Sequence, residues 1–445
     1  MKQRIGLGNY AVSGVLLSLV ACAATGPETT TTEEEATTSS ARRHHDVISD
    51  AVVREWTQIA VNTIGAQPPF PSTRFMATVE LAMFEAVNTI TGKYEAYLGT
   101  VSAAPGASPQ AAAAAAAHAV LKGFFPAATA TLDAKLAATL ATLPDDGKAD
   151  GVAAGQAAGA AMLANRTGDG SAPPAFYNPP TPGAPGEWQR TASCGAPGGA
   201  FAHWQNVKPF GIQSSSQFRA DAPPALGSKK YANDFEEVVE LGNGAFGTNP
   251  NRSTDREDVV KVYGAQPPHQ GWNQIALQII ATRNDDISDT VRTLALMNLS
   301  LSDSHISVFE SKYFYKAWRP ITAVAGADTD GNNNTDVSAF TSPIPAPCFP
   351  SYPSAHGVGA GAASRVLEKA YGKRHDFTVT TPSLPLITLH YDSIADVVSD
   401  VSDARVYGGI HFRFDQDGAE KQGKKIANYN LDHVLQKQDD ERCDD

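Results

Sequence analysis

Three short blocks in the C-terminal third of the chain hold side chains that suit the binding of a tetrahedral oxyanion. They are Lys312 to Pro320 (KYFYKAWRP), Pro353 to His356 (PSAH) and Ala404 to Asp415 (ARVYGGIHFRFD). Lysine and arginine neutralise an anion, and the planar guanidinium donates to two oxygens at once. Of two histidines, one can attack or ligate the central atom while the other moves protons. The blocks therefore predict a site that does chemistry on phosphate or vanadate.

The order and spacing of the blocks resemble those of the vanadium-dependent haloperoxidases, which share their site with the phosphatidic acid phosphatase type 2 superfamily. In that pattern six residues separate a lysine from Arg-Pro, Pro-Ser-Gly-His follows, and Ser-Arg precedes a histidine and then an aspartate. Lys312 and Arg319 keep the first spacing, and Arg405 lies before His411 and Asp415 at the family's intervals. Each block alone is a weak signal, but three blocks in order are a strong one.

The chain departs from the family pattern at three positions. Ala355 replaces the glycine of Pro-Ser-Gly-His, and Ala404 replaces the serine before the arginine. If the turn needs a positive φ at Ala355, alanine costs about 1 kcal/mol there, although its N–H remains available. Phe309 stands where many haloperoxidases have tryptophan, which weakens the resemblance somewhat.

The resemblance implies a vanadate cofactor held by cations, a hydroxyl, a backbone N–H and an imidazole. The implied cofactor-binding residues are Lys312, Arg319, Ser354, Ala355, Arg405 and His411, with His411 as the metal ligand. The implied catalytic residues are His356, as acid and base, and Lys312, which polarises peroxide. Asp415 is expected to support His411 rather than bind the cofactor itself. The implied reaction oxidises halide with hydrogen peroxide to hypohalous acid, which can pass to a small organic acceptor.

Local patterns predict how each block is held. A helix over Asp303 to Trp318 places Lys312 two turns after His305, and Pro320 disfavours a helical Arg319, which is expected at the helix end. A second helix begins near Ser354, and its free N–H groups form an anion site.

The third block is expected to begin with a helix that carries Arg405. Gly408-Gly409 bends or ends this helix, after which His411 and Asp415 share a face at i, i+4.

Two other functions remain as alternatives. The same residues would hold phosphate, so the protein is alternatively a soluble acid phosphatase in which His411 forms a phosphohistidine and His356 protonates the leaving alcohol. The peroxidase is favoured because Gly151 to Gly170, Gly186 to Trp188 and Val207 to Phe210 also resemble bacterial haloperoxidase-like proteins. A non-catalytic oxyanion-binding or adhesion lipoprotein is disfavoured, since simple binding needs neither proton-transferring histidine.

The predicted fold class is all-α, built of helical bundles, with the oxyanion site in the C-terminal bundle. Ala111 to Leu140 has helical spacing broken at Pro126, and the small residues of Gly151 to Asn165 allow close helix approach. Ser171 to Pro224 is rich in Pro and Gly and is predicted to be a long surface excursion. A boundary within Leu241 to Asn251 divides an N-terminal helical domain (47–245) from a haloperoxidase/acid-phosphatase-like bundle (246–438), and an acidic tail follows (439–445).

The N-terminal segment has the pattern of an export signal. Residues 1–22 combine a charged start, a short apolar run and Leu19-Val20-Ala21-Cys22, which resembles a bacterial lipobox. The alternative is an ordinary signal peptide cut nearby. Residues 23–46 have few large apolar side chains and are predicted to be a flexible tether. The protein is therefore expected to be exported and lipid-anchored to the bacterial cell envelope, with membrane contact only through Cys22.

Composition and cysteines limit the remaining possibilities. A net charge of −12 argues against nucleic acid as a partner. Without Cys22, the residues Cys194, Cys348 and Cys443 allow at most one disulfide, whose partners the sequence does not select, and Cys348 is interpreted as a buried small apolar residue. Asp328 to Asp336 (DTDGNNNTD) lacks the far glutamate of a calcium loop, so a solvated, turn-rich loop is predicted instead.

Overall fold

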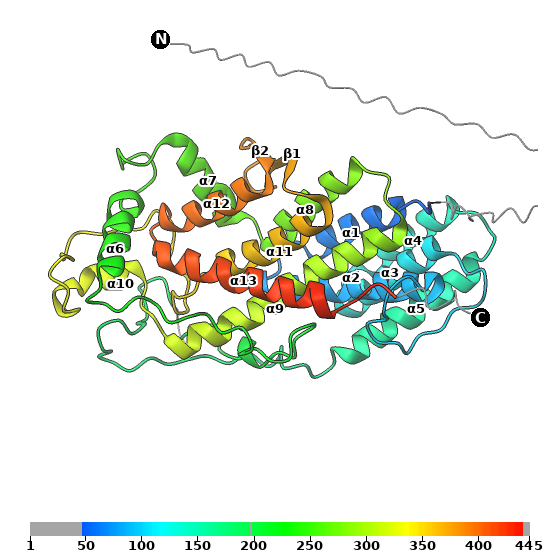
Figure 1. Ribbon diagram of the computed structural model, residues 1–445, viewed down its shortest axis with the longest axis horizontal. Helices are drawn as coiled ribbons and strands as arrows, with labels where there is room; N and C mark the ends of the chain where they lie inside the picture. Colours follow the sequence, from blue (N-terminus) through cyan, green and yellow to red (C-terminus); the bar gives the residue numbers. More distant parts are fainter. Residues whose placement is uncertain (1–46, 196–197, 439–445) are drawn as a thin grey trace, which may run out of the picture. The chain divides into compact units, whose positions relative to one another are not determined.

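The protein is built mainly from α-helices, as the sequence predicts (Figure 1). The computed structural model describes residues 47–195 and 198–438; the predicted signal peptide, the tether and the acidic tail lie outside them. The α-helices are α1 Ala51–Ile64, α2 Pro69–Thr91, α3 Pro109–Phe124, α4 Thr129–Ala141, α5 Lys148–Asn165, α6 Lys229–Gly242, α7 Thr254–Ala265, α8 Pro268–Ala281, α9 Ile287–Tyr315, α10 Pro320–Ala325, α11 Ala355–Tyr371, α12 Ile394–Val406 and α13 Arg413–His433. Short 3₁₀ turns lie at Pro126–Ala128, Trp204–Asn206 and Ala327–Thr329.

One antiparallel hairpin, which the sequence reasoning missed, stands beside α12 and is visible near the top of Figure 1. Its strands are β1 Arg374–Val379 and β2 Leu389–Ser393, and Phe377 pairs with Tyr391 across it. Only part of β1 alternates between buried and exposed residues, and the strand is six residues long. Such a short period-2 signal is easily lost between two helical segments.

The helices α3 and α5 pack closely through the small residues that the sequence singled out. A Cβ added to Gly155 would lie 2.2 Å from the carbonyl oxygen of Ala112, and one added to Gly151 would lie 2.3 Å from that of Ser108. The prediction that Gly151 to Asn165 allows close helix approach is therefore confirmed. The expected break at Pro126 is also confirmed, because α3 ends at Phe124 and α4 begins at Thr129.

The longest helix, α9, lies between the earlier and the later helices of the chain. It packs against α2 on one side and against α11 and α13 on the other, and nearly all of its 29 residues are buried. The predicted helix Asp303 to Trp318 is thus too short at its start and too long at its end. The predicted domain boundary falls in the loop between α6 and α7, while one hydrophobic core continues from α2 through α9 to α11. The division at 245/246 stays a prediction.

The segment from Ser171 to Pro224 forms a long irregular connection, as predicted, but it is not confined to the surface. Trp188 and Trp204 within it are 0% and 1% exposed and pack as core residues. Cys194 forms a disulfide with Cys348. The interpretation of Cys348 as a lone buried apolar residue is therefore wrong, because the excursion brings a second cysteine to it.

The loop Asp328 to Asp336 is held by turns of its own polar side chains. Asp330 accepts the N–H of Asn332 at 2.7 Å, and Asn332 donates to the carbonyl of Leu226 at 2.7 Å. Both side chains are buried, so the expectation of a solvated loop is wrong at its centre. Across the described residues, no group of three or more His, Cys, Asp or Glu side chains is placed to hold a metal ion.

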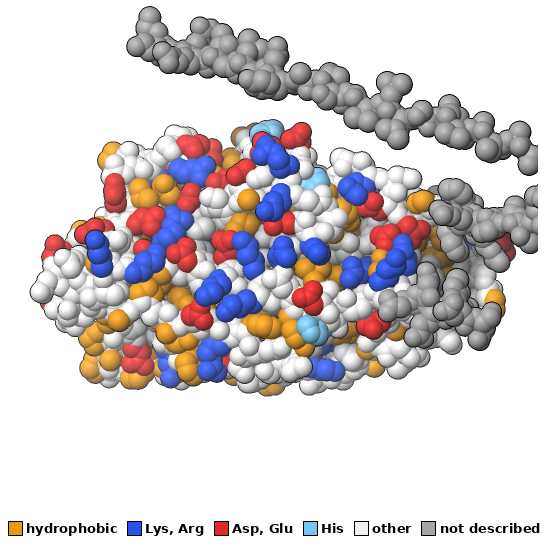
Figure 2. Space-filling view, viewed as in Figure 1, with side chains coloured by type: hydrophobic (Ala, Val, Ile, Leu, Met, Phe, Trp, Pro, Cys, Tyr) orange, Lys and Arg blue, Asp and Glu red, His pale blue; other side chains and the backbone are white. Residues whose placement is uncertain are grey.

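On the face shown in Figure 2, lysine and arginine side chains are interspersed with aspartate and glutamate. Ion pairs also join elements distant in sequence, such as the partly buried Arg413 and Glu237 at 2.6 Å. Ion pairs at the protein surface contribute little individually. Within the described ranges, we find no helix with the length and apolar character needed to span a bilayer.

The close contact between α3 and α5 yields a stability prediction. Gly155→Ala should lower the free energy of unfolding by about 1–3 kcal/mol, because the new methyl group overlaps the Ala112 carbonyl. Gly227→Ala is the matched control, since a Cβ there has no neighbour within 4 Å, and its effect should stay within about 0.5 kcal/mol. Urea unfolding of both variants measures the difference. An unchanged or raised stability in Gly155→Ala would contradict the packing described.

Candidate oxyanion site

The three sequence blocks meet in one buried cluster. Arg319 Nη1 lies 3.0 Å from His411 Nε2, and Arg405 Nη1 lies 3.3 Å from each ring nitrogen of His356. Lys312 and Arg319 are 0% exposed, and Arg405 is 3% exposed. His356 is the more accessible member of the cluster. Residues from the end of α9, the start of α11 and the approach to α13 are thus brought together as predicted.

Hydrogen bonds to backbone carbonyls orient both cations of the first block. Lys312, in the last turn of α9, donates from Nζ to the carbonyls of Pro350 and Ser351 at 2.8 and 2.7 Å. Arg319 donates from Nε to Phe349 at 3.0 Å and from Nη1 to the carbonyl of Ile410 at 2.8 Å. The segment 349–351 therefore contacts both cations.

The position of Arg319 differs from the expected one in a single respect. Its backbone is extended, with φ −90° and ψ 156°, as the following proline requires. It caps the start of α10 instead of ending α9, because Lys316 already terminates that helix in a left-handed conformation at φ 50°.

The second block forms the N-terminus of α11. Ser354 is the N-cap residue, and its hydroxyl oxygen accepts the N–H of Gly357 at 3.3 Å. Ala355 is the first residue of the right-handed helix, so the possible cost of a positive φ does not arise. A Cβ at Gly359 would lie 3.1 Å from Nε2 of the buried His305, which explains a small residue at that position.

His411 lies between two helices and not on one. The helix α12 ends at Val406, Gly409 turns the chain with φ 69°, and α13 begins only at Arg413. Asp415, in the first turn of α13, accepts from the N–H of Phe412 at 3.1 Å and lies 2.7 Å from His411 Nδ1. The predicted i, i+4 contact between His411 and Asp415 is confirmed, but a helix cap makes it and not one face of a helix.

These contacts define the tautomer of His411. The guanidinium of Arg319 can only donate, so Nε2 is the acceptor, and Nδ1 carries the proton that goes to Asp415 Oδ2. Ser351 also donates to this oxygen, at 2.6 Å. The lone pair of Nε2 consequently faces the cationic side of the cluster. Sequence reasoning missed Ser351, although it lies within the Pro-rich run directly before the second block.

The cluster buries three cations with a single carboxylate. Burial lowers the pKa of Arg319 to about 9 and that of Arg405 to about 10. Burial and the neighbouring Arg319 hold the pKa of Lys312 well below its usual value, and Asp415 opposes this effect. Burial raises the pKa of Asp415 to about 6. An anion would relieve the repulsion among the cations and favour the charged form of each.

Both histidines are neutral in this environment. The pKa of His356 lies well below its usual value because of burial and then the charge of Arg405. The pKa of His411 is lowered in the same way by burial and then by Arg319. A neutral imidazole keeps one nitrogen free to accept a proton or to bond an electrophilic atom.

The donor set of the cluster fits vanadate. Arg405 is buried, yet its Nε and Nη2 atoms have no hydrogen-bond acceptor among the described residues. Buried N–H donors without partners are costly, and charged ones most of all. A tetrahedral oxyanion would supply the missing acceptors and the missing negative charge together.

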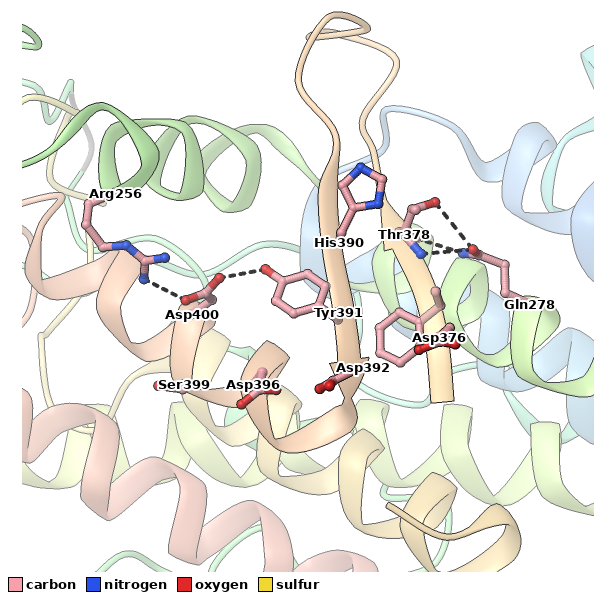
Figure 3. Close-up of a pocket in the computed structure, with 11 residues that line it drawn as sticks. Arg256, Gln278, Asp376, Thr378, His390, Tyr391, Asp392, Asp396, Ser399 and Asp400 are labelled. Atoms are coloured by element: carbon pink, nitrogen blue, oxygen red, sulfur yellow. Dashed lines mark hydrogen bonds and ion pairs between the residues drawn. The ribbon is translucent and has the colours of Figure 1, made fainter. Parts of the chain in front are cut away.

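A concave region of about 860 Å³ lies beside the hairpin, away from the cluster residues (Figure 3). Its polar side chains already pair with one another: Arg256 binds Asp400 at 2.6 Å, and the Tyr391 hydroxyl donates to the same carboxylate at 2.8 Å. Gln278 bonds the backbone of Thr378. None of the predicted site residues lines this region, so we assign it no role.

Comparison with known proteins supports the grouping of the three blocks into one site. The family model described as the VCPO second helical-bundle domain matches residues 292–440, a range that contains all three blocks. The chain is also similar to vanadium chloroperoxidase of Curvularia inaequalis, with 22% identity over 280 residues, or 48% of this chain and 46% of that protein. Residues 292–440 thus match the second helical-bundle domain of the vanadium chloroperoxidases. The matched region spans about half the length of the Curvularia inaequalis relative.

Solved structures of bacterial haloperoxidases share the fold of this chain. The first bacterial vanadium-dependent iodoperoxidase structure aligns with a TM-score of 0.75 and 21% identity, covering 88% of this chain and 99% of that one. A holo-type bacterial vanadium-dependent chloroperoxidase aligns with a TM-score of 0.69 and 16% identity, covering 87% and 98%. These likenesses include the N-terminal helices, which the matched family model does not cover.

The tautomer of His411 yields the prediction for this site. In Asp415→Asn the amide can donate to Nδ1, which moves the ring proton to Nε2 and removes the lone pair facing the cations. Vanadate affinity should fall roughly ten- to a hundred-fold, while phosphate, which uses the donors of the site without a bond to Nε2, should bind about as well as before. Equilibrium dialysis for vanadium and calorimetry for phosphate measure the two constants.

Asp417→Asn is the control for this prediction, because it changes the same group two residues along α13, where the side chain is 59% exposed. An equal loss of both anions in Asp415→Asn would instead indicate a general distortion of the site.

Proposed function

We propose that the protein is a vanadate-dependent haloperoxidase that oxidises halide with hydrogen peroxide to hypohalous acid. The observation that carries the proposal is the lone pair of His411 Nε2, which faces Arg319 in a cluster of three buried cations whose charge a single carboxylate does not balance. The similarity to a vanadium chloroperoxidase and to bacterial vanadium-dependent iodo- and chloroperoxidases supports the same activity. Hydrogen peroxide and halide are the proposed substrates, and a small organic acceptor would receive the halogen.

The proposed cofactor contacts use the donors that the cluster brings together and the lone pair of His411 Nε2. The cations Lys312, Arg319 and Arg405 neutralise the anion, the hydroxyl of Ser354 and the N–H of Ala355 bind its oxygens, and His411 Nε2 bonds the metal. When bound, vanadate supplies a Lewis acid that activates peroxide without changing its own oxidation state. The protein contributes fixed donors in a site from which water is largely excluded.

His356 and Lys312 are proposed to act on the peroxide. His356 is neutral and accessible, so one of its ring nitrogens can accept a proton from incoming hydrogen peroxide and return it to a leaving oxygen. Lys312 uses two of its three N–H donors on the carbonyls of Pro350 and Ser351. Its third donor is free to bind a peroxide oxygen and increase its electrophilicity.

Export and lipid anchoring remain proposals based on residues 1–22. The charged start, the apolar run and Cys22 support a lipoprotein attached to the cell envelope. Labelled fatty acid should be incorporated into the wild-type protein and not into Cys22→Ser. Incorporation of the fatty acid into both proteins would show that the lipid is attached to a residue other than Cys22.

The proposed activity predicts the outcome of one comparison. Protein dialysed against vanadate should halogenate a dimedone-type reporter in the presence of peroxide and bromide, and it should hydrolyse p-nitrophenyl phosphate only slightly. The same protein dialysed against phosphate is the control and should not halogenate. Strong phosphatase turnover without halogenation would favour the acid phosphatase, with His411 as its nucleophile.

The unpartnered donors of Arg405 predict its contribution to binding. Arg405→Ala should cost about 1.5–3 kcal/mol, or roughly ten- to a hundred-fold in vanadate affinity, because charge-assisted hydrogen bonds are lost. Arg405→Lys should recover only part of this, since a point charge does not reproduce the fork.

Phosphate competition should weaken in parallel in these variants, because both anions use the same donors. Arg365→Ala removes an arginine whose hydrogen bond to Asn428 is exposed, and it should bind like wild type. If Arg405→Ala bound vanadate as tightly as the wild type, Arg405 would not be a contact of the bound anion.

A further inference from the structure

The disulfide between Cys194 and Cys348 lies directly beside the segment that holds the site's cations. The three residues after Cys348 are Phe349, Pro350 and Ser351, and their carbonyls accept hydrogen bonds from Arg319 and Lys312. The Phe349 ring also lies 5.3 Å from Lys312 Nζ and 5.2 Å from the guanidinium carbon of Arg319. A shift of this short segment would therefore move the acceptors of both cations at once.

The segment is anchored at its downstream end by the backbone. The N–H of Ser351 donates to the carbonyl of Ala317 at 2.9 Å, and the Ser351 hydroxyl donates to Asp415. These contacts tie Ser351 both to the connection between α9 and α10 and to the first turn of α13.

The upstream end depends on the excursion 171–224. Apart from the disulfide, the N–H of Ala200 donates to the carbonyl of Cys348 at 2.7 Å, and Ser193 Oγ donates to that of Ala346 at 3.0 Å. The excursion is fixed in turn to α9, because the hydroxyl of Tyr313, the residue after Lys312, donates to the carbonyl of Ala200. The disulfide is the covalent link in this upstream anchor.

We propose that the Cys194–Cys348 disulfide is a positioning element of the oxyanion site. By fixing residue 348 against the excursion, it holds the carbonyls of 349–351 where they orient the Lys312 and Arg319 side chains toward the bound anion. The identity of the cofactor rests on the function proposed above. The positioning role concerns oxyanion binding itself and is tested with inorganic phosphate, which requires no peroxidase activity.

The full-length variants Cys194→Ala and Cys348→Ala and the double variant provide the test. Calorimetric titration at 25 °C should show phosphate binding weakened on the order of ten-fold in each. The three losses should be equal, because each variant removes the same bond, and a double-mutant cycle detects this non-additivity. Phosphate also avoids the reduction of vanadate by a freed thiol.

Two controls separate positioning from stability. Gly155→Ala lowers stability far from the site, so it should leave phosphate affinity unchanged even where its loss of unfolding free energy matches that of the cysteine variants. If the cysteine variants do not fold, wild-type protein reduced with a phosphine, with reduction verified by mass spectrometry, is titrated instead and should show the same loss.

Two outcomes would overturn the positioning role, and a third would contradict only the proposed peroxidase activity. Unchanged phosphate affinity in folded cysteine variants or in reduced wild type would leave the disulfide a purely stabilising bond. Additive losses in the two single variants would assign the effect to the separate side chains and not to the bond. Absence of halogenation with intact phosphate results would contradict the proposed peroxidase and leave the positioning role standing.

Discussion

The structure depends on the burial of three cationic side chains around one histidine. Removing charges from water costs several kcal/mol each unless other groups replace the lost solvation. Here a single carboxylate, Asp415, lies among Lys312, Arg319 and Arg405. Backbone carbonyls supply part of the missing stabilisation for Lys312 and Arg319, and the N–H groups of Arg405 lack even that. The cluster thus has the charge and the free donors that a bound anion would complement.

The surrounding elements can be understood as supports for that charge. The helix α9 carries Lys312 and is buried along nearly its whole length, so the cation has little freedom to reach water. The N-terminus of α11 adds N–H groups and a positive dipole end to the same cluster. The first turn of α13 places Asp415 behind His411, where it orients the ring without occupying the anion's place. Each support comes from a different part of the chain.

Much of this arrangement could be predicted from the sequence because residue type and spacing report local chemistry directly. Pro320 alone indicates an extended Arg319, and Ser354 indicates a helix start, since both effects act within a few residues. The pairing of Cys194 with Cys348 could not be predicted, because a separation of 154 residues leaves no local signal. Ser351 escaped notice for the same reason: its partner Asp415 is 64 residues away. The i, i+4 pairing of His411 with Asp415 was predicted correctly, but not its place at a helix start, because a helix cap and a helix face share the same sequence spacing.

The buried cation excess also links the anion to the folding equilibrium. An anion that binds the folded chain and not the unfolded chain stabilises the protein by RT ln(1 + [L]/Kd), which reaches about 2.7 kcal/mol at a hundred times Kd. Phosphate would act in this way although it is not the proposed cofactor, since the same donors receive it. If phosphate binds the cluster as proposed, the apparent melting temperature of this chain should be higher in a phosphate buffer than in a chloride buffer of the same pH.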